Sequence, residues 1–285
     1  MHLTASPLAP IGIFDSGIGG LSVLQALRHE LPHEHFVYVA DSAHAPYGER
    51  DEAFVQQRTE AIARHLRNRF AIKALVIACN TATAAAVEGL RRAMPELPLI
   101  GVEPALKPAA LGSQSHRVGV MATRGTVNSA RFARLLSEHS QNTQFTVQAC
   151  DGLARAIELA TELPPAADMQ RTDLWARCVQ HTQALGSFGR QAGEIDTLVL
   201  GCTHYVFVKN ELRALLGPDV QLIDTGAPVA RQVRRLLGQA DLLAPDAPSA
   251  PPIELFATGA LRSLQAAAQR WLDLPAGHCA HIDIA

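Results

Sequence analysis

Long apolar runs are missing from this sequence of 285 residues. No stretch reaches the roughly twenty apolar residues that a membrane-spanning helix needs, and the longest apolar segments, such as residues 74–78, have the length of a strand. The segment 1–10 also lacks the basic start and long apolar run of a signal peptide. We therefore expect a cytoplasmic protein with no membrane partner.

A charge of one sign is also missing. The chain carries 25 basic and 27 acidic residues, a formal net charge of −2, and they are spread along its length. No basic block favours nucleic acid as a partner, and no acidic tail indicates disorder. With 48% hydrophobic residues, the chain has enough apolar surface for a globular fold.

Cysteine is scarce, and no CxxC pair occurs. The odd number and wide spacing argue against a disulfide framework, so the thiols are either buried filler or reactive groups. The spacing of Cys202 and His204, and of His278, Cys279 and His281, fits no familiar zinc pattern, and we expect no metal. The five cysteines are at positions 79, 150, 178, 202 and 279.

Short apolar runs alternate with segments of helical periodicity along most of the chain. Apolar strands separated by helices predict α/β domains with parallel sheets covered on both faces. In such sheets, reactive groups collect at the carboxyl ends of the strands. The predicted strands are 11–14, 36–40, 74–78, 99–102, 117–122, 145–149, 197–201, 221–223 and 253–257, and surface loops are expected at 163–168 and 244–252.

Two pairs of segments resemble each other. LVIACNT (75–81) matches LVLGCTH (198–204), and residues 11–17 match residues 118–125 in the same order. Each cysteine follows an apolar strand and precedes small polar residues and a predicted helix. This repeat predicts two similar halves that face each other, each with one thiol.

Cys79 and Cys202 are the leading candidates for chemistry. The N–H groups at a helix start favour negative charge, which biases a thiol there toward thiolate, and His204 lies within reach of the second thiol's proton. A single free cysteine is most often a small buried hydrophobe, but two in matched contexts favour function. Two opposed thiols, one acting as base and the other as acid, would invert a carbon by proton transfer.

The glycine-rich turn at residues 15–20 follows the first strand. It lacks the GxGxxG spacing of a dinucleotide loop. Asp15 and Ser16 at the strand end are expected to point into a cleft, with the glycines allowing close backbone approach. A simple turn with a capping aspartate is the alternative interpretation.

The chain resembles glutamate racemases of the aspartate/glutamate racemase superfamily over nearly its whole length. The matching segments are GIFDSGIGGL (12–21), 41–50 around PYG (46–48), CNT (79–81), ATRGT (122–126) and LGCTHY (200–205). The resemblance implies two pseudo-symmetric αβα domains with the active site between them. The first domain would comprise residues 1–101 and 213–285, and the second residues 102–212. It also implies a homodimer that needs no cofactor, interconverts L- and D-glutamate and supplies D-glutamate for peptidoglycan synthesis and cell wall biogenesis.

The resemblance also implies roles for individual residues. Cys79 would exchange the α-proton on the D-glutamate side with support from Asp15, and Cys202 would act on the L side with support from His204. Glu158 would be a further carboxylate near Cys202. The implied substrate-binding residues are Asp15, Ser16, Pro46, Tyr47, Gly48, Asn80, Thr81, Thr123, Thr126, Thr203 and His204, with Tyr47 and Gly48 offering backbone donors.

The chain departs from the family pattern between Ala149 and Glu158, where Asp151 and Arg155 stand in a segment that commonly contains prolines. Its N-terminus is also short of the extension that lets some relatives respond to a peptidoglycan precursor, so such activation is not expected. Two other functions stay open. One is aspartate racemase, and the other is a non-catalytic amino-acid-binding protein, which would need neither thiol.

Overall fold

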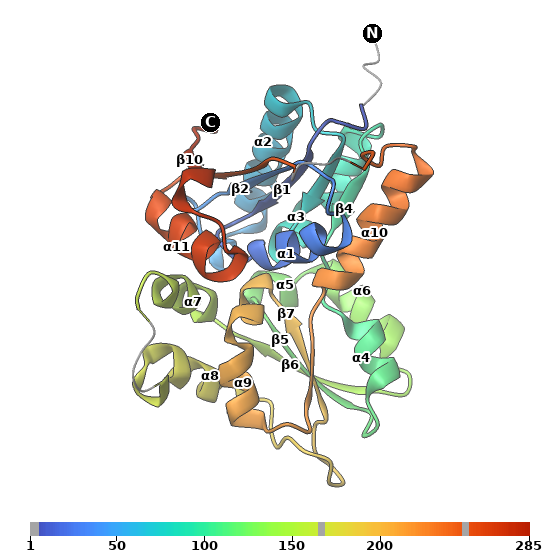
Figure 1. The fold of residues 1–285 in the computed structure, drawn as a ribbon. Coiled ribbons are helices and arrows are strands. Elements are labelled where there is room, and N and C mark those ends of the chain that lie inside the picture. Colours follow the sequence, from blue (N-terminus) through green and yellow to red (C-terminus); the bar gives the residue numbers. More distant parts are fainter. Residues whose placement is uncertain (1–5, 165–168, 247–250) are drawn as a thin grey trace.

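The computed structural model describes residues 6–164, 169–246 and 251–285, which form two α/β domains stacked one on the other (Figure 1). Each domain is built on one parallel sheet. Parallel strands need long crossovers, and the apolar strands alternate with helices as the sequence predicts. Among the described residues, no helix is long and apolar enough to cross a membrane.

The first domain contains a six-stranded sheet in the order β10-β9-β2-β1-β3-β4, with every neighbouring pair parallel. Helices α1, α10 and α11 pack on one face, and α2 and α3 on the other. The strands are β1 Ile11–Asp15, β2 Phe36–Ala40, β3 Ala74–Ile77, β4 Leu99–Gly101, β9 Ile253–Ala257 and β10 Cys279–His281. The helices are α1 Leu21–Glu30, η1 Tyr47–Glu49, α2 Glu52–Phe70, α3 Asn80–Ala93, α10 Gly226–Gln239, α11 Leu261–Leu272 and η4 Ala276–His278.

The second domain contains a four-stranded parallel sheet in the order β6-β5-β7-β8. Helices α7, α8 and α9 cover one face, and α4 and α6 the other. The strands are β5 Arg117–Ala122, β6 Gln144–Ala149, β7 Thr197–Gly201 and β8 Gln221–Ile223. The helices are α4 Leu106–Gly112, α5 Arg124–Val127, α6 Ala130–His139, α7 Leu153–Thr161, η2 Met169–Arg171, α8 Asp173–Gln183, η3 Thr203–Val208 and α9 Lys209–Leu216.

The strand order repeats between the domains. The order β2-β1-β3-β4 in the first sheet corresponds to β6-β5-β7-β8 in the second. Cys79 comes two residues after the end of β3, and Cys202 directly follows β7. The predicted fold class, two similar α/β halves with one thiol at equivalent strand ends, is therefore confirmed.

Several local expectations differ from the structure. Strand β8 pairs with β7, whereas the expected boundary after residue 212 leaves this strand with the first domain; we propose instead that the second domain extends through Ile223. Cys202 is followed by the 3₁₀ helix η3 before α9 begins, and Tyr205 and Val208 of η3 are buried in the core. The sequence analysis did not predict strand β10, because this strand has only three residues. Residues 1–5 and parts of the two expected surface loops, 165–168 and 247–250, lie outside the described residues.

A buried carboxylate anchors the segment between β2 and α2. The guanidinium of Arg58 donates two hydrogen bonds to Asp41, at 3.1 and 3.0 Å, and the Tyr47 hydroxyl donates a third at 2.5 Å. Asp41 is fully buried, yet its pKa is lowered, since hydrogen bonds from Arg58, Tyr47 and Thr258 outweigh the opposing effect of burial. The network fixes Tyr47 and thereby the backbone of η1.

We predict that Arg58→Met destabilises the protein by about 3–5 kcal/mol, because it removes the guanidinium that compensates the buried Asp41 carboxylate. Urea unfolding measures the loss. The matched control is Arg64→Met on the same helix, whose exposed ion pair with Glu60 contributes about 0–1 kcal/mol. Equal losses for the two variants would contradict the proposed role of Arg58.

Candidate active site

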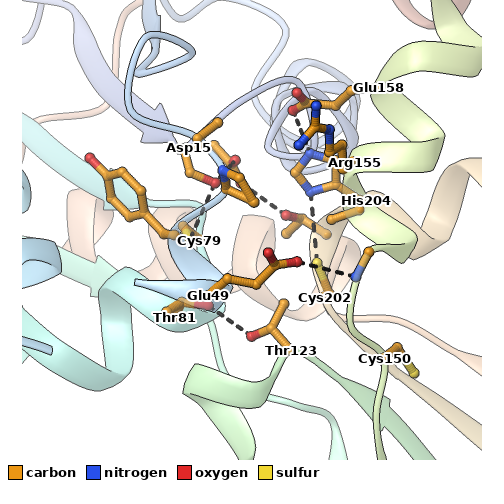
Figure 2. Close-up of a pocket in the computed structure, with 18 of the residues that line it drawn as sticks. Asp15, Glu49, Cys79, Thr81, Thr123, Cys150, Arg155, Glu158, Cys202 and His204 are labelled. Carbon is orange, nitrogen blue, oxygen red and sulfur yellow. Dashed lines mark hydrogen bonds and ion pairs between the residues drawn. The ribbon is translucent and has the colours of Figure 1, made fainter. Parts of the chain in front are cut away.

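A pocket lies between the two domains, where the carboxyl ends of both sheets face each other (Figure 2). Its cavity of about 280 Å³ is of a size to hold a small molecule. Segments that follow β1, β3, β5 and β7 contribute to it, together with η1 and α7. The lining includes these residues singled out from the sequence: Asp15, Ser16, Pro46, Tyr47, Gly48, Cys79, Asn80, Thr81, Thr123, Glu158, Cys202, Thr203 and His204.

Cys79 caps the N-terminus of α3. Its sulfur accepts a hydrogen bond from the Ala82 N–H at 3.5 Å and lies 4.0 Å from the Ser16 hydroxyl. Burial raises the pKa of Cys79 to about 12, and the nearby Asp15 charge adds to the effect, which the Ala82 N–H opposes. Desolvation therefore opposes the expected bias of this thiol toward thiolate, which the helix N-terminus favours.

Cys202 begins a chain of polar contacts in the second domain. Its sulfur lies 3.7 Å from Nδ1 of His204, and Nε2 of the same ring lies 2.8 Å from Glu158 Oε1. Burial by itself would lower the pKa of His204, but hydrogen bonds and charge from Cys202 and Glu158 outweigh it and raise that pKa well above its ordinary value. Glu158 and Cys202 therefore favour the protonated form of this imidazole.

Asp15 lies at the end of β1 and is fully buried. Its carboxylate accepts hydrogen bonds from the Gly17 N–H at 2.8 Å and, across the domain interface, from the Thr203 hydroxyl at 2.9 Å. Burial raises the pKa of Asp15, and the charge of His204 with these two donors opposes the rise. Asp15 thus joins the turn after β1 to the residue that follows Cys202.

Hydroxyl and amide groups form another part of the wall. Thr81 and Thr123, from different domains, are 2.9 Å apart at their Oγ1 atoms. Thr126 does not line the pocket, since it is 2% exposed and lies behind this pair at 3.0 Å from Thr123. The Asn80 side chain donates to Val102 O, while its Oδ1 is buried without a hydrogen-bond partner among the described residues. Such an acceptor is costly unless a ligand donates to it.

The segment after Pro46 presents backbone to the pocket. The ring of Tyr47 points away from it into the core and is fully buried. The N–H groups in the first turn of a helix have no partner within that helix, and Tyr47 and Gly48 occupy this turn of η1 at the pocket wall. The two residues can thus offer neutral donors to a carboxylate, as the family resemblance implies.

The pocket rim holds charged residues to which sequence reasoning gave no role. Arg124 and Asp151 form an ion pair, and Glu49 accepts a hydrogen bond from the Gly152 N–H of the other domain at 3.2 Å. Arg155 lies near Glu158, one helical turn earlier (Figure 2). Glu49, Arg124 and Arg155 lie directly beside, or one helical turn from, Gly48, Thr123 and Glu158 in the sequence. This proximity could have indicated their place at the pocket rim. The rim also includes Ser42, Cys150, Ala154, Leu159, Glu162 and Ser263.

Two parallel-sheet domains that enclose a pocket at their strand ends define a two-domain α/β protein with a ligand site between its domains. The profile of the Asp/Glu/hydantoin racemase family matches residues 19–233. The chain belongs to this family and is an amino-acid racemase, an isomerase.

Three relatives illustrate the likeness. A glutamate racemase from Ectopseudomonas mendocina is 46% identical over 258 residues, covering 90% of this chain and 92% of that one. The crystal structure of a glutamate racemase isoform from Bacillus anthracis is 31% identical, with a TM-score of 0.82 over 96% of this chain and 97% of that one. The Escherichia coli enzyme, in complex with L-glutamate and the activator UDP-MurNAc-Ala, is 30% identical, with a TM-score of 0.79 over 97% and 99%.

We predict that Glu158→Gln lowers the pKa of His204, because it removes the negative charge that faces the ring. NMR titration of the ring protons measures the change. Hydrogen bonds and charge from His204 also lower the pKa of Glu158, against the effect of burial. The pair therefore stabilises the fold above the ordinary pKa of a glutamate and below that of a histidine, and this contribution is lost as the pH rises through the raised His204 pKa.

The control for this titration is Glu162→Gln, which removes a carboxylate from the same pocket rim. Glu162 pairs with Arg262 instead of His204. A His204 pKa that responds equally to both substitutions would contradict the specific pairing with Glu158.

Proposed function

We propose that this chain interconverts L- and D-glutamate by transferring the α-proton between two thiols, without a cofactor. The observation that carries the proposal is the presence of Cys79 and Cys202 in one pocket, each at the same topological position of its domain. Both cysteines are free thiols. Relatives that cover most of the chain are named glutamate racemase, which supports glutamate as the substrate.

The proposed reaction begins with L-glutamate and a protonated Cys79. Cys202, as thiolate, takes the α-proton, and the electron pair left on the α-carbon takes the proton of the Cys79 thiol on the opposite face. The products are D-glutamate, a Cys202 thiol and a Cys79 thiolate, and the reverse reaction or exchange with water restores the first state. The raised pKa of Cys79 and the position of His204, whose Nδ1 lies 3.7 Å from the Cys202 sulfur, support these roles.

Neutral donors would hold the substrate between the thiols. We assign the amino-acid head to Asn80, Thr81, Thr123 and Thr203 with Ser16 close by, and the side-chain carboxylate to the backbone of Tyr47 and Gly48. Neutral groups stabilise negative charge without fixing the protonation state of either thiol. Thr126 would position Thr123, and Asp15 and His204 would support the D side and the L side respectively.

The family resemblance further supports a role in supplying D-glutamate for peptidoglycan synthesis, and thereby in cell wall biogenesis and cell shape. It also supports a homodimer, which sedimentation of the purified chain would test. A cytoplasmic location and independence from a precursor activator stay predictions from the sequence.

We predict that L-glutamate incubated with the protein in D₂O, without added cofactor, loses optical rotation to zero and acquires deuterium at the α-carbon. Polarimetry and proton NMR on the same sample follow both changes. Activity confined to aspartate would favour the neighbouring racemase instead. Binding of glutamate with neither change would favour a non-catalytic binding protein.

We predict that Cys79→Ala and Cys202→Ala each reduce racemisation by at least about 10²–10⁴-fold, the usual contribution of a general acid or base. Circular dichroism is expected to show an unchanged fold. The matched control is Cys178→Ala, which removes a buried thiol of the second domain that lies outside the pocket. Near-normal turnover in either pocket variant would disprove the two-thiol assignment.

A further inference from the structure

The turn after β1 packs directly against the polar chain that serves Cys202 in the other domain. A Cβ atom added at Gly17 would lie 1.8 Å from Glu158 Oε1, and one added at Gly19 would lie 2.2 Å from His204 Nδ1. No side chain of any size fits at these two positions while Glu158 and His204 keep their places. The two glycines therefore leave room for side chains that lie about 140 and 185 positions away in the sequence.

The contact also includes a hydrogen bond. The Ile18 N–H donates to Glu158 Oε1 at 3.1 Å, and the same oxygen lies 2.8 Å from His204 Nε2. One carboxylate oxygen thus joins the backbone of the first domain to the imidazole of the second. A carboxylate held by a backbone donor and an imidazolium has little freedom to reorient.

We propose that Gly17 is a positioning residue for the Cys202 half of the reaction: its missing side chain lets the first domain hold Glu158 against His204. The inference rests on the proposed function and deepens it. The support of Cys202 by His204 and Glu158 then depends on the contact between the two domains. A second hydrogen bond crosses the interface in the opposite direction, from the Thr203 hydroxyl of the second domain to Asp15 of the first.

Gly17→Ala is a specific test, because the side chain that its methyl group would displace is that of Glu158. The backbone of Gly17 is outside the left-handed region, so alanine adopts it without strain, and the three atoms nearest to the new methyl group all belong to Glu158. The nearest is the far end of a flexible side chain. The protein can therefore fold by turning Glu158 aside, at the loss of its contacts with Ile18 and His204.

The expected result is a loss of kcat/KM on the order of tenfold, as for one charge-assisted hydrogen bond. The step by which Cys202 removes the α-proton becomes more rate-limiting. The kinetic isotope effect on kcat/KM is therefore expected to rise for α-deuterated L-glutamate and to fall for α-deuterated D-glutamate. An unchanged pair of isotope effects, or a shift toward the D-glutamate side, overturns the proposal.

A double-mutant cycle separates positioning from general destabilisation. In a Glu158→Ala background, Gly17→Ala is expected to have no further effect on kcat/KM, because the side chain it displaces is gone. An additive loss overturns the proposal. Gly12→Ala, in the strand β1 that precedes this turn, is the steric control: its methyl group would meet the end of the core residue Ile72 at 2.9 Å, and it is expected to leave both isotope effects unchanged.

Glu158→Asp provides a second route that adds no bulk to the turn. Its shorter side chain withdraws the carboxylate from Ile18, and it is expected to shift the isotope effects in the same direction as Gly17→Ala. A shift in the opposite direction or no shift overturns the proposal. Failure of the proposed function itself would be distinct, since the unmodified protein would then exchange no α-proton at all.

Discussion

Burial of ionisable groups between two domains is the constraint on which the rest of the structure depends. Asp15, Glu158, His204 and both pocket thiols lie at one interface, where an uncompensated charge is costly. Each charge is compensated by a donor or partner, and two of those hydrogen bonds cross between the domains, from Thr203 to Asp15 and from Ile18 to Glu158. The site is therefore complete only when the sheets stand in this relation, and the glycines that permit the approach serve both domains.

Much of the fold was predictable because parallel sheets impose a simple pattern. Strands covered on both faces must be apolar throughout, and their crossovers must be helical, so β1, β2, β3 and β7 were visible as short apolar runs. The repeat around the two cysteines was visible for the same reason, and the strand orders confirm it. The short edge strand β10 and the domain assignment of β8 depend on tertiary pairing, which three-residue segments do not encode locally.

The site was predictable only in part. Strand-end logic located Asp15, Cys79 and Cys202, since side chains at the carboxyl ends of neighbouring parallel strands converge. The strand pattern could not predict that burial and the charge of Asp15 raise the pKa of Cys79 against the effect of the helix N-terminus. It also could not separate Thr123 at the wall from Thr126 behind it, because both follow the same strand within four residues.

The two thiols are equivalent in topology but not in environment, and the difference matters for a two-base reaction. Such a reaction needs one acid and one base at the same pH, and identical sites would not define which thiol is which. Here Cys79 lies near an acidic carboxyl, and Cys202 lies beside a histidine whose protonated form is stabilised by Glu158. Burial and the charge of Asp15 therefore favour a proton on Cys79, whereas the His204–Glu158 pair stands beside Cys202. An equilibrium constant of unity between mirror-image substrates requires no symmetry of the enzyme, so different surroundings for the two thiols of a duplicated fold are compatible with racemisation.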